Sequence, residues 1–506
     1  MTRLARVGAA GFAIALAAAF LSGCAPEPDL LWSPASWQAT GSIVDSPPHE
    51  TSDAQLTDFR VRNDDLGIDA RWGRLAGEQP INAAIEQTVR DAVAASENAR
   101  GVKYSPQAHP AGAGLGERGC SAGAMSTPAG ELMAGRSGTV VVCEVVLARG
   151  NVFGEALRTV TAGDGAVTAD TTTTFYTDFS TGAVGTGDAL FGEVLPLWTS
   201  MIEVLRRDAG SLSLLPVTSP TLEQVTVLQA ALKNAVLAEG HVIIPVPAEL
   251  TAVELEGLAA WSSSPEARPS FVSVEATGLT PLGDAIAHAS GPFTGPAAMG
   301  MGWEHVPCDL VPCMAMTLDD GPSPLTPGFL DVLRDNHAAA TFFMLGQEAQ
   351  AYPDIVRRVA AEGHQIGNHT WNHPHLTTVP PETITDQISR TNAVLRELSG
   401  QPVATFRPPG GLLTKEGLAL VGMPAIMWSV DTRDWAQPTD DDLRAYAIDT
   451  PEIGSIVLMH DIQDVTSRVF ADVVSGLNDR GFVLVTIDQL FDGAVPSGVV
   501  RHGPPG

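Results

Sequence analysis

The sequence predicts two folded parts: an α/β fold at the C-terminus, expected as a distorted (β/α) barrel, and a separate α+β domain before it. The chain has 506 residues, which is more than one hydrophobic core usually holds. Strand-like and helical segments alternate in residues 300–495, and such repeated βα units form parallel sheets. In residues 56–290 the two kinds of segment are mixed without this alternation, which favours an α+β domain.

The composition supports folded domains and argues against a nucleic-acid partner. Hydrophobic residues make up 44% of the chain and charged residues only 17%, a balance typical of proteins with a hydrophobic core. The formal net charge is −29 at pH 7. Since binding to nucleic-acid phosphates needs a basic surface, we expect no nucleic-acid partner. The sequence leaves protein partners open.

The first 24 residues predict export and a lipid anchor. Two arginines precede an apolar run over residues 7–21, which is short for a membrane span and fits a signal peptide over residues 1–23. The run leads into Leu-Ser-Gly-Cys, which resembles the bacterial lipobox, where the cysteine after the cleavage site, here Cys24, carries the lipid. We therefore expect an extracytoplasmic lipoprotein anchored to the cell membrane. The alternative is an ordinary secretory signal with an incidental cysteine.

Four more cysteines follow in the predicted domains: Cys120, Cys143, Cys308 and Cys313. An even number outside the cytoplasm predicts disulfides, and pairing each cysteine with its nearest neighbour in sequence is the economical choice. A zinc site built from all four thiolates is the competing interpretation. The spacings lack the C-x2-C pairs that such sites use, so structural disulfides are favoured.

Residues 24–55 are rich in Pro, Ser and acidic residues and predict a linker that carries the lipid anchor. The accessory α+β domain is expected over residues 56–290. Its sequence 175–191, FYTDFSTGAVGTGDALF, weakly resembles the RsiV-like domain that precedes some bacterial deacetylase domains. Its role is left open between substrate positioning and partner sensing. The expected strands are 59–64, 138–148, 168–179, 241–250 and 271–279, and the expected helices are 81–99, 195–210 and 221–240.

The last region supplies most of the chemical signal. Polar residues follow the apolar strand patterns, and the C-terminal ends of parallel strands are where a β/α barrel builds its active site. The expected strands are 314–318, 340–345, 364–369, 403–407, 425–430, 455–461 and 482–487. The expected helices are 325–336, 351–363, 381–400 and 466–481.

Two adjacent acids, Asp319 and Asp320, stand at the end of the first of these strands, in TLDDGP. Neighbouring carboxylates repel each other unless a cation or a hydrogen-bond donor lies close by. The simpler interpretation is turn chemistry, with Asp320 starting the turn at Gly-Pro. The residues at the other strand ends distinguish between a cation-binding site and a simple turn.

Two histidines, His369 and His373, follow another strand in NHTWNHPHL. Because Pro374 disfavours helical conformation at His373, we expect a loop with both imidazoles turned toward the barrel mouth. A histidine-rich loop without function is the alternative. Together with an aspartate, the two histidines form a ligand set for a divalent metal, and zinc suits it, although cobalt, nickel or iron also fits.

Three further strand ends carry charged residues. Arg407 ends one strand, and its guanidinium would hold a neighbouring carboxylate ionised. Asp434 follows another strand and is a candidate partner for Arg407. His460 ends a buried apolar run, where it is either a core histidine or, beside a metal, a general acid.

The motifs TLDDGP, HTWNH, RPPGG, DTRDW and IVLMH occur in the order and approximate spacing of five motifs of polysaccharide deacetylases, the NodB homology domain of carbohydrate esterase family four. The resemblance covers residues 314–490. It implies that Asp319 is the catalytic base and His460 the acid. The other matching positions would orient the base (Arg407, Asp434), bind the metal (Asp320, His369, His373) and line the acetyl pocket (Trp435, Leu458).

The chain departs from the family pattern at two positions. Leu318 replaces a phenylalanine, which changes packing only. Gly410 stands where the family has an aromatic residue. The resemblance implies that the backbone N–H here helps to bind the oxyanion, which glycine retains, whereas the missing ring affects substrate preference.

The resemblance implies a hydrolase acting on amide bonds, which releases acetate from amino sugars of a cell-wall polysaccharide, with peptidoglycan as the first choice. Chitin oligomers, exopolysaccharide, O-acetyl xylan and a catalytically degenerate wall-binding lipoprotein are the alternatives. A serine esterase is disfavoured because it would need its own nucleophile, and the one G-x-S-x-G match, residues 119–123, lies far from the motifs of the last region. A metalloprotease is disfavoured because Thr370 stands where H-E-x-x-H needs glutamate.

Overall fold

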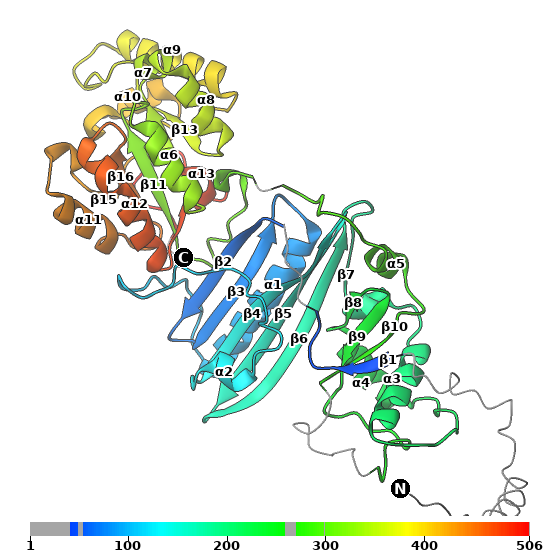
Figure 1. Ribbon diagram of the computed structural model, residues 1–506. Coiled ribbons are helices and arrows are strands. Elements are labelled where there is room, and N and C mark those ends of the chain that lie inside the picture. The colour runs from blue at the N-terminus through cyan, green and yellow to red at the C-terminus, as the bar shows by residue number, and fades with distance from the viewer. Residues whose placement is uncertain (1–40, 49–53, 259–269, 298, 505–506) are drawn as a thin grey trace, which may run out of the picture.

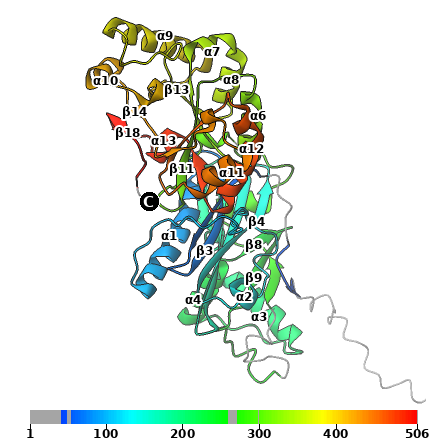
Figure 2. The same ribbon diagram turned by 90° about the vertical axis from the view of Figure 1, so that its left-hand side faces the viewer.

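The computed structural model describes residues 41–48, 54–258, 270–297 and 299–504 (Figure 1). The predicted signal peptide and Cys24 lie outside these residues and stay predictions. Both views place the barrel at one end of the molecule, a six-stranded sheet in the middle and a four-stranded sheet at the other end (Figures 1 and 2). Among the described helices, none has both the length and the apolar character needed to cross a bilayer.

The barrel is built on parallel strands around a central one, β11. The strand order is β13 (Gln365–Asn368), β12 (Thr341–Met344), β11 (Cys313–Asp319), β16 (Ile456–His460) and β15 (Val430–Asp431). The wall continues from β13 through single bridges at Phe406 to β14 (Ala425–Ile426), which pairs with β18 (Val499–Val500).

The barrel is distorted at its centre and along one wall. β11 pairs with β17 (Val483–Val485) through its first residues and with β12 through its last ones. The strand predicted at 403–407 is reduced to a bridge at Phe406, because prolines flank it and cannot donate to a ladder. The strand predicted at 425–430 splits into β14 and β15. The fold ends later than the predicted residue 495, since β18 completes the wall.

Alternation along β11 separates the core from the site. Met314, Met316 and Leu318 are buried in the hydrophobic core with residues of the surrounding helices. Because side chains alternate between the faces of a strand, Thr317 and Asp319 point to the opposite, interior face. The helices are α6 (Thr326–Asp335), α7 (Gly346–Ala351), α8 (Pro353–Ala361), α9 (Pro381–Ser399), α10 (Lys415–Val421), α11 (Asp440–Asp449), α12 (Asp464–Asp479) and α13 (Ile487–Leu490).

The accessory region contains two sheets. The larger has the order β2 (Leu56–Asn63), β3 (Ile68–Leu75), β4 (Gly138–Arg149), β5 (Val152–Gly163), β6 (Ala166–Asp178) and β7 (Ala183–Thr186). Only its β3–β4 pair is parallel. Helix α1 (Pro80–Arg100) packs on this sheet through the apolar side chains Ile81, Ile85 and Val89, and α2 (Ala129–Met133) contacts β4, β5 and β6.

The smaller sheet corrects two predicted boundaries. Its antiparallel order is β1 (Gly41–Val44), β10 (Phe271–Glu275), β9 (His241–Pro245) and β8 (Val236–Ala238), with helices α3 (Leu195–Asp208), α4 (Leu222–Leu232) and α5 (Pro281–Ala287) beside it. The linker predicted over 24–55 therefore contains a strand, because all four residues of β1 pair antiparallel with β10. The helix predicted over 221–240 ends at Leu232, and its last part forms β8, which pairs with β9.

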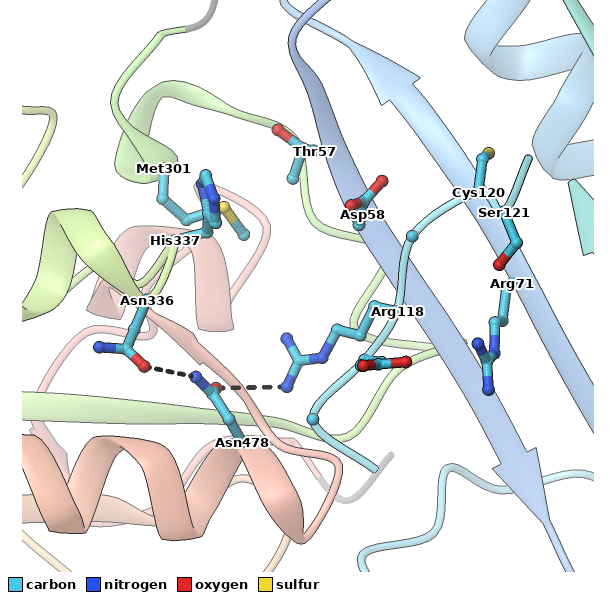
Figure 3. A pocket seen from close by; sticks show the side chains of 13 residues that line it. Thr57, Asp58, Arg71, Arg118, Cys120, Ser121, Met301, Asn336, His337 and Asn478 are labelled. Carbon is cyan, nitrogen blue, oxygen red and sulfur yellow. Dashed lines mark hydrogen bonds between the residues drawn. The ribbon is translucent and has the colours of Figure 1, made fainter. Parts of the chain in front are cut away.

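The barrel and the larger accessory sheet pack through the N-terminal ends of the barrel strands. One hydrophobic cluster includes Phe59 and Trp72 of the sheet together with Ala315 and Val485 of the barrel. Backbone hydrogen bonds cross the boundary, such as His109 N–H to the Arg480 carbonyl at 2.9 Å. A polar cavity of about 390 Å³ remains between the two parts, lined by Asp58, Arg71, Arg118, Asn336, His337 and Asn478 among others (Figure 3).

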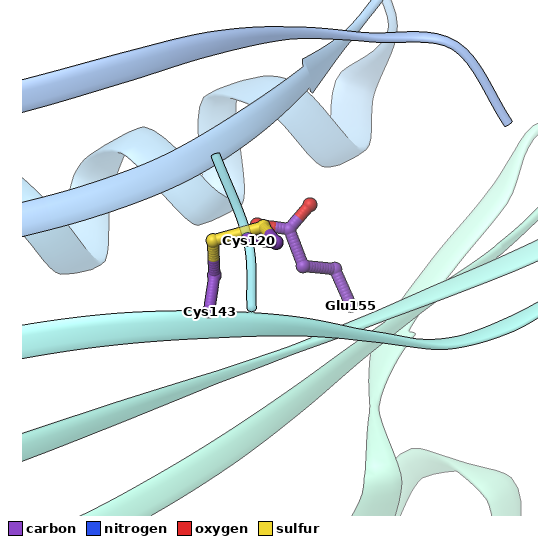
Figure 4. Close-up of side chains that lie close together, drawn as sticks. All are labelled: Cys120, Cys143 and Glu155. Atoms are coloured by element: carbon purple, nitrogen blue, oxygen red, sulfur yellow. A yellow bond between two sulfur atoms is a disulfide. The ribbon is translucent and has the colours of Figure 1, made fainter. Parts of the chain in front are cut away.

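Two disulfides stabilise the fold away from the barrel mouth. The structure joins Cys120 to Cys143 and Cys308 to Cys313. These sulfurs are therefore not thiolates that could form the four-cysteine zinc site considered as an alternative. The first bridge lies beside the buried side chain of Glu155 (Figure 4).

Candidate active site

Seven polar residues predicted from the sequence converge at the C-terminal ends of the barrel strands. Asp319 ends β11 and His460 ends β16, and the two are paired in register across adjacent strands. His369 directly follows β13, and Arg407 follows the bridge residue Phe406. The remaining predicted ligands and acids lie in the loops that follow these strands: Asp320, His373 and Asp434.

Asp319 is ionically paired deep in the barrel. Its Oδ1 accepts a hydrogen bond of 2.8 Å from Arg407 Nη1, and both side chains are buried. The same guanidinium donates to Thr317 Oγ1 at 2.7 Å and to the carbonyls of Ile426 and Met427. These contacts fix the guanidinium, so a permanent positive charge stands against one oxygen of Asp319.

Three ligand-type atoms meet beside this pair. Asp320 Oδ1 lies 3.4 Å from His369 Nε2 and 3.5 Å from His373 Nε2. This oxygen, Asp320 Oδ1, is buried and has no hydrogen-bond partner among the residues that the structure describes. A buried, unpartnered carboxylate oxygen facing two imidazole nitrogens fits a divalent metal, because it needs a cation to offset its desolvation.

Electrostatics reinforces this interpretation. Burial alone would raise the pKa of Asp320, but the close approach of the His369 imidazole, with His373 and His460 beyond, outweighs burial and lowers this pKa to about 2. Burial opposes the charge on His369, yet Asp319 and Asp320 outweigh it and raise the pKa of this imidazole. Burial lowers the pKa of His373. A divalent ion would replace the proton that the carboxylates otherwise hold on His369.

The surrounding backbone aims the two imidazoles. His369 Nδ1 lies 2.7 Å from the Arg407 carbonyl, which orients the ring and leaves Nε2 toward Asp320. Asp320, Thr370 and His373 have φ angles of 71°, 70° and 61°, a region that residues other than glycine seldom adopt. Such conformations cost free energy, and their clustering around the ligand atoms is typical of a functional site.

A second charged pair, His460 and Asp434, faces the first. His460 Nδ1 lies 2.7 Å from Asp434 Oδ1, while its Nε2 is 4.0 Å from Asp320 Oδ2. Burial alone would lower the pKa of His460, but the hydrogen bond and charge of Asp434 outweigh it and raise the pKa to about 9. At neutral pH His460 is therefore a proton donor whose Nε2 faces the ligand atoms.

The position of Asp434 differs from the expected one. The sequence predicts it as a partner for Arg407, but Asp434 bonds the ring and backbone N–H of His460 and the hydroxyl of Thr466. Its carboxylate orients the acid rather than the base. This arrangement follows from the turn after β15, where the 3₁₀ segment Asp434–Ala436 directs the carboxylate toward the end of β16.

The three predicted substrate-binding positions differ in exposure. Leu458 is buried in β16, whereas the side chain of Trp435 is 57% exposed. Gly410 has a φ of 61°, and a Cβ there would lie 3.7 Å from the His375 ring. The structure therefore places a histidine, which the sequence interpretation did not single out, beside the glycine.

Two positioning residues were not predicted. Thr317 holds Arg407, and it carries a signal, since it is a polar residue two positions before Asp319 in an apolar strand and so shares its face. Thr466 donates to Asp434 Oδ2 at 2.7 Å. It lies in the first turn of α12, and nothing in its local sequence distinguishes it from a helix residue of the surface.

Comparison with known proteins shows which proteins the barrel is similar to. Residues 308–422 match the family described as polysaccharide deacetylase. The chain is 38% identical over 179 residues to a peptidoglycan-N-acetylglucosamine deacetylase of Listeria monocytogenes, covering 35% of this chain and 38% of that protein. It is 34% identical over 178 residues to a peptidoglycan-N-acetylmuramic acid deacetylase of Bacillus subtilis, again covering 35% and 38%.

The similarity thus spans well under half the length of these two relatives. A chitooligosaccharide deacetylase of Azorhizobium caulinodans is 38% identical over 188 residues, which cover 33% of this chain but 90% of that protein. Nearly the whole of one relative therefore corresponds to the barrel. Through this barrel, the chain belongs to the polysaccharide deacetylase family.

Proposed function

We propose that this chain is a metal-dependent hydrolase that removes N-acetyl groups from amino sugars of peptidoglycan. The observation that carries the proposal is the barrel mouth. There the carboxylate of Asp319, held by the buried Arg407, lies beside the three ligand-type side chains. His460, whose charged form is stabilised by the buried Asp434, lies opposite. The names of the relatives, which act on peptidoglycan and on chitooligosaccharides, support amide hydrolysis of an amino sugar.

Asp319 is the base in this proposal. Arg407 holds its Oδ1, while its Oδ2 lies 3.8 Å from His369 Nε2, at the edge of the ligand set. This oxygen takes a proton from the water that attacks the amide carbonyl carbon. The backbone N–H of Gly410 stabilises the oxyanion that develops, and Leu458 and Trp435 enclose the acetyl methyl.

His460 is the acid. Its Nδ1 is held by Asp434, so its Nε2 proton points to the ligand set and is given to the departing amine nitrogen. The carbon–nitrogen bond then breaks, and the products are acetate and a free amino sugar. The proton taken by Asp319 and the one given by His460 balance the reaction.

Asp320, His369 and His373 would hold the divalent ion, which we propose is zinc, because one carboxylate and two imidazoles suit this ion. Such an ion would polarise the amide carbonyl and acidify water nearby. The structural reason to assign a metal to this place is Asp320 Oδ1, a buried oxygen for which the described residues provide no hydrogen bond.

Acetate release tests the proposed activity. The purified chain is assayed on N-acetylated peptidoglycan fragments, chitotetraose and O-acetyl xylan, before and after chelation and after zinc is added back. We expect the fastest release from peptidoglycan, loss on chelation and recovery with zinc. Asp320→Asn should release little acetate unless zinc is in excess, while the exposed Asp335→Asn serves as the matched control.

If no acetate is released from any of these substrates, a wall-binding protein without catalysis is favoured. If acetate release is unchanged by the chelator, the proposed metal dependence is wrong. Faster release from chitotetraose than from peptidoglycan would keep the reaction and change the substrate. Unchanged muropeptide acetylation in a deletion strain would also count against peptidoglycan.

We also propose that the protein is a lipoprotein on the outer face of the cell membrane, where peptidoglycan is the nearest amino-sugar polymer. The support is the LSGC sequence behind a short apolar run. Cys24→Ala should stop lipidation and leave the protein uncleaved or released. Membrane retention of Cys24→Ala after processing at another site would refute this anchor.

A further inference from the structure

An exposed apolar loop follows helix α3 at the end of the molecule remote from the barrel (Figures 1 and 2). Three leucines in it, Leu212, Leu214 and Leu215, are 82%, 68% and 73% exposed. Single exposed leucines are ordinary on protein surfaces, but three within four residues form a concentrated apolar tip. We call residues 211–215 the leucine loop.

The backbone of the leucine loop is held by hydrogen bonds. Two consecutive arginines at the end of α3 bond its backbone carbonyls: Arg206 Nη1 to Leu215 at 2.8 Å, and Arg207 to Ser211 and Ser213 at 2.7 Å each. The backbone N–H of Leu215 donates to Ser213 Oγ at 3.3 Å. The loop therefore satisfies much of its own backbone polarity while turning its leucine side chains outward.

The internal hydrogen bonds of the loop backbone bear on which partner the loop can contact. A bilayer interior offers few hydrogen-bond partners, so a segment that enters it must satisfy its backbone internally. Both arginines that do this share one carboxylate: Glu203 Oε1 lies 2.7 Å from Arg207, and the other oxygen of Glu203 pairs with Arg206. The three leucine side chains of the loop remain exposed.

The described chain begins next to the helix that leads into the leucine loop. The first described residue is Gly41, and a Cβ built on it would lie 3.0 Å from the Val204 side chain. Val204 lies about one turn before the end of α3. Residues 25–40 separate Cys24 from Gly41. Because an extended chain spans at most about 3.6 Å per residue, a lipid on Cys24 would hold this end within about 60 Å of the membrane.

We propose that the leucine loop docks on the membrane surface, inserting Leu212, Leu214 and Leu215 into a phospholipid bilayer. The barrel would then stand away from the membrane, with its mouth toward the wall. With a net charge of −29, the protein is not drawn to anionic lipid, so apolar insertion drives the contact. This inference does not depend on the proposed catalytic activity.

Flotation with vesicles tests it. The chain from residue 24, carrying Cys24→Ser and hence no lipid, is mixed with phosphatidylcholine vesicles at high salt. We expect the variant with Leu212→Ser, Leu214→Ser and Leu215→Ser to bind at least about tenfold more weakly than its parent. A matched variant alters three exposed apolar residues elsewhere, Val102→Ser, Leu420→Ser and Val499→Ser, and should bind like the parent.

A spectroscopic measurement keeps the proposal falsifiable if binding is weak. A tryptophan in Leu214→Trp should be quenched by lipids brominated on the acyl chain, whereas one in Leu420→Trp should not. Equal vesicle binding by parent and loop variant, or no quenching at position 214, would overturn the proposal. So would concentration-dependent dimers that only the loop variant loses in sedimentation, since the occupant would then be a second copy.

Discussion

The barrel and the accessory sheet each bury an acid, and the two acids are held in opposite ways. Asp319 is 3% exposed and is paired at 2.8 Å with the guanidinium of Arg407, which is fully buried. Glu155 is fully buried as well, but its Oε1 accepts only the Gly73 N–H, at 3.1 Å, and lies 3.6 Å from the Cys120 sulfur. Its other oxygen has no hydrogen-bond partner in the part of the chain that the structure describes. Burial raises the pKa of Glu155 to about 8.

The presence or absence of a paired cation distinguishes a buried acid of a functional site from a buried acid of the core. A carboxylate that is neutral when buried can stay in a core without a counter-charge, as Glu155 does beside its disulfide. Keeping a carboxylate ionised there requires a permanent cation with its own hydrogen bonds satisfied, which the barrel provides at Asp319. Burying such an ion pair costs free energy, so we expect one where the negative charge serves a function.

The largest expected effect concerns the other charged pair at the barrel mouth. His460→Gln should lower kcat by roughly 10²–10⁴-fold, the usual contribution of a positioned acid, with the metal retained. Because His460 must be protonated, activity of the parent should fall as pH rises through about 9. Asp434→Asn removes the carboxylate that raises this pKa, so the fall should move to lower pH. An unshifted pH profile in Asp434→Asn would contradict the assignment.

The next effect is on stability. Arg407→Met leaves Asp319 buried without its cation and should lower the free energy of unfolding by about 3–5 kcal/mol. Urea denaturation measures it. Adding Asp319→Asn to this variant should recover part of the loss, because the unpaired charge is then removed. A double variant no more stable than Arg407→Met would show that packing, and not charge, holds the arginine.

Glu155 should respond in the reverse manner. Its folded pKa is raised, so the folded state binds more protons between pH about 4.5 and about 8, and stability falls as pH rises through this range. Glu155→Gln should flatten this slope while changing stability little near pH 5. Thermal unfolding from pH 5 to pH 9 measures it. An unchanged slope in Glu155→Gln would mean that Glu155 is ionised in the fold and would break the comparison.

The smallest effect is expected at the rim. Trp435 is more than half exposed, so Trp435→Ala should raise KM only a few-fold and leave kcat nearly unchanged. Its backbone N–H, which bonds Asp434 Oδ1 at 2.9 Å, survives the substitution. A large loss of kcat would show that the ring contributes to the transition state and not only to substrate binding.

The site was more predictable than the accessory region, for a physical reason. Apolar strands that end in charged residues mark a barrel mouth, and this pattern located Asp319, His369 and His460. What it did not reveal was the partner of Asp434, because that choice depends on the turn after β15 in three dimensions. Short helices such as α7 and α13 carry too few apolar repeats to be found.

Strands β3 and β5 were missed because they contain charges that look unsuited to a sheet. In β3, Asp69 pairs with Arg60 at 2.8 Å and with Arg136 at 3.1 Å. In β5, Arg158 pairs with Asp170 of the neighbouring strand at 2.7 Å. Each charge is neutralised by a residue distant in sequence or on another strand, so local patterns cannot show that the segment is compatible with a sheet.

The most direct test of the central claim separates the adjacent acids, Asp319 and Asp320. Metal content and kcat are measured on Asp319→Asn and Asp320→Asn, prepared identically. Asp319→Asn should keep its metal and lose kcat by roughly 10²–10⁴-fold, as expected for a base. Asp320→Asn should bind metal weakly and regain part of its activity in excess zinc. Loss of metal from Asp319→Asn, or full metal and activity in Asp320→Asn, would contradict the account.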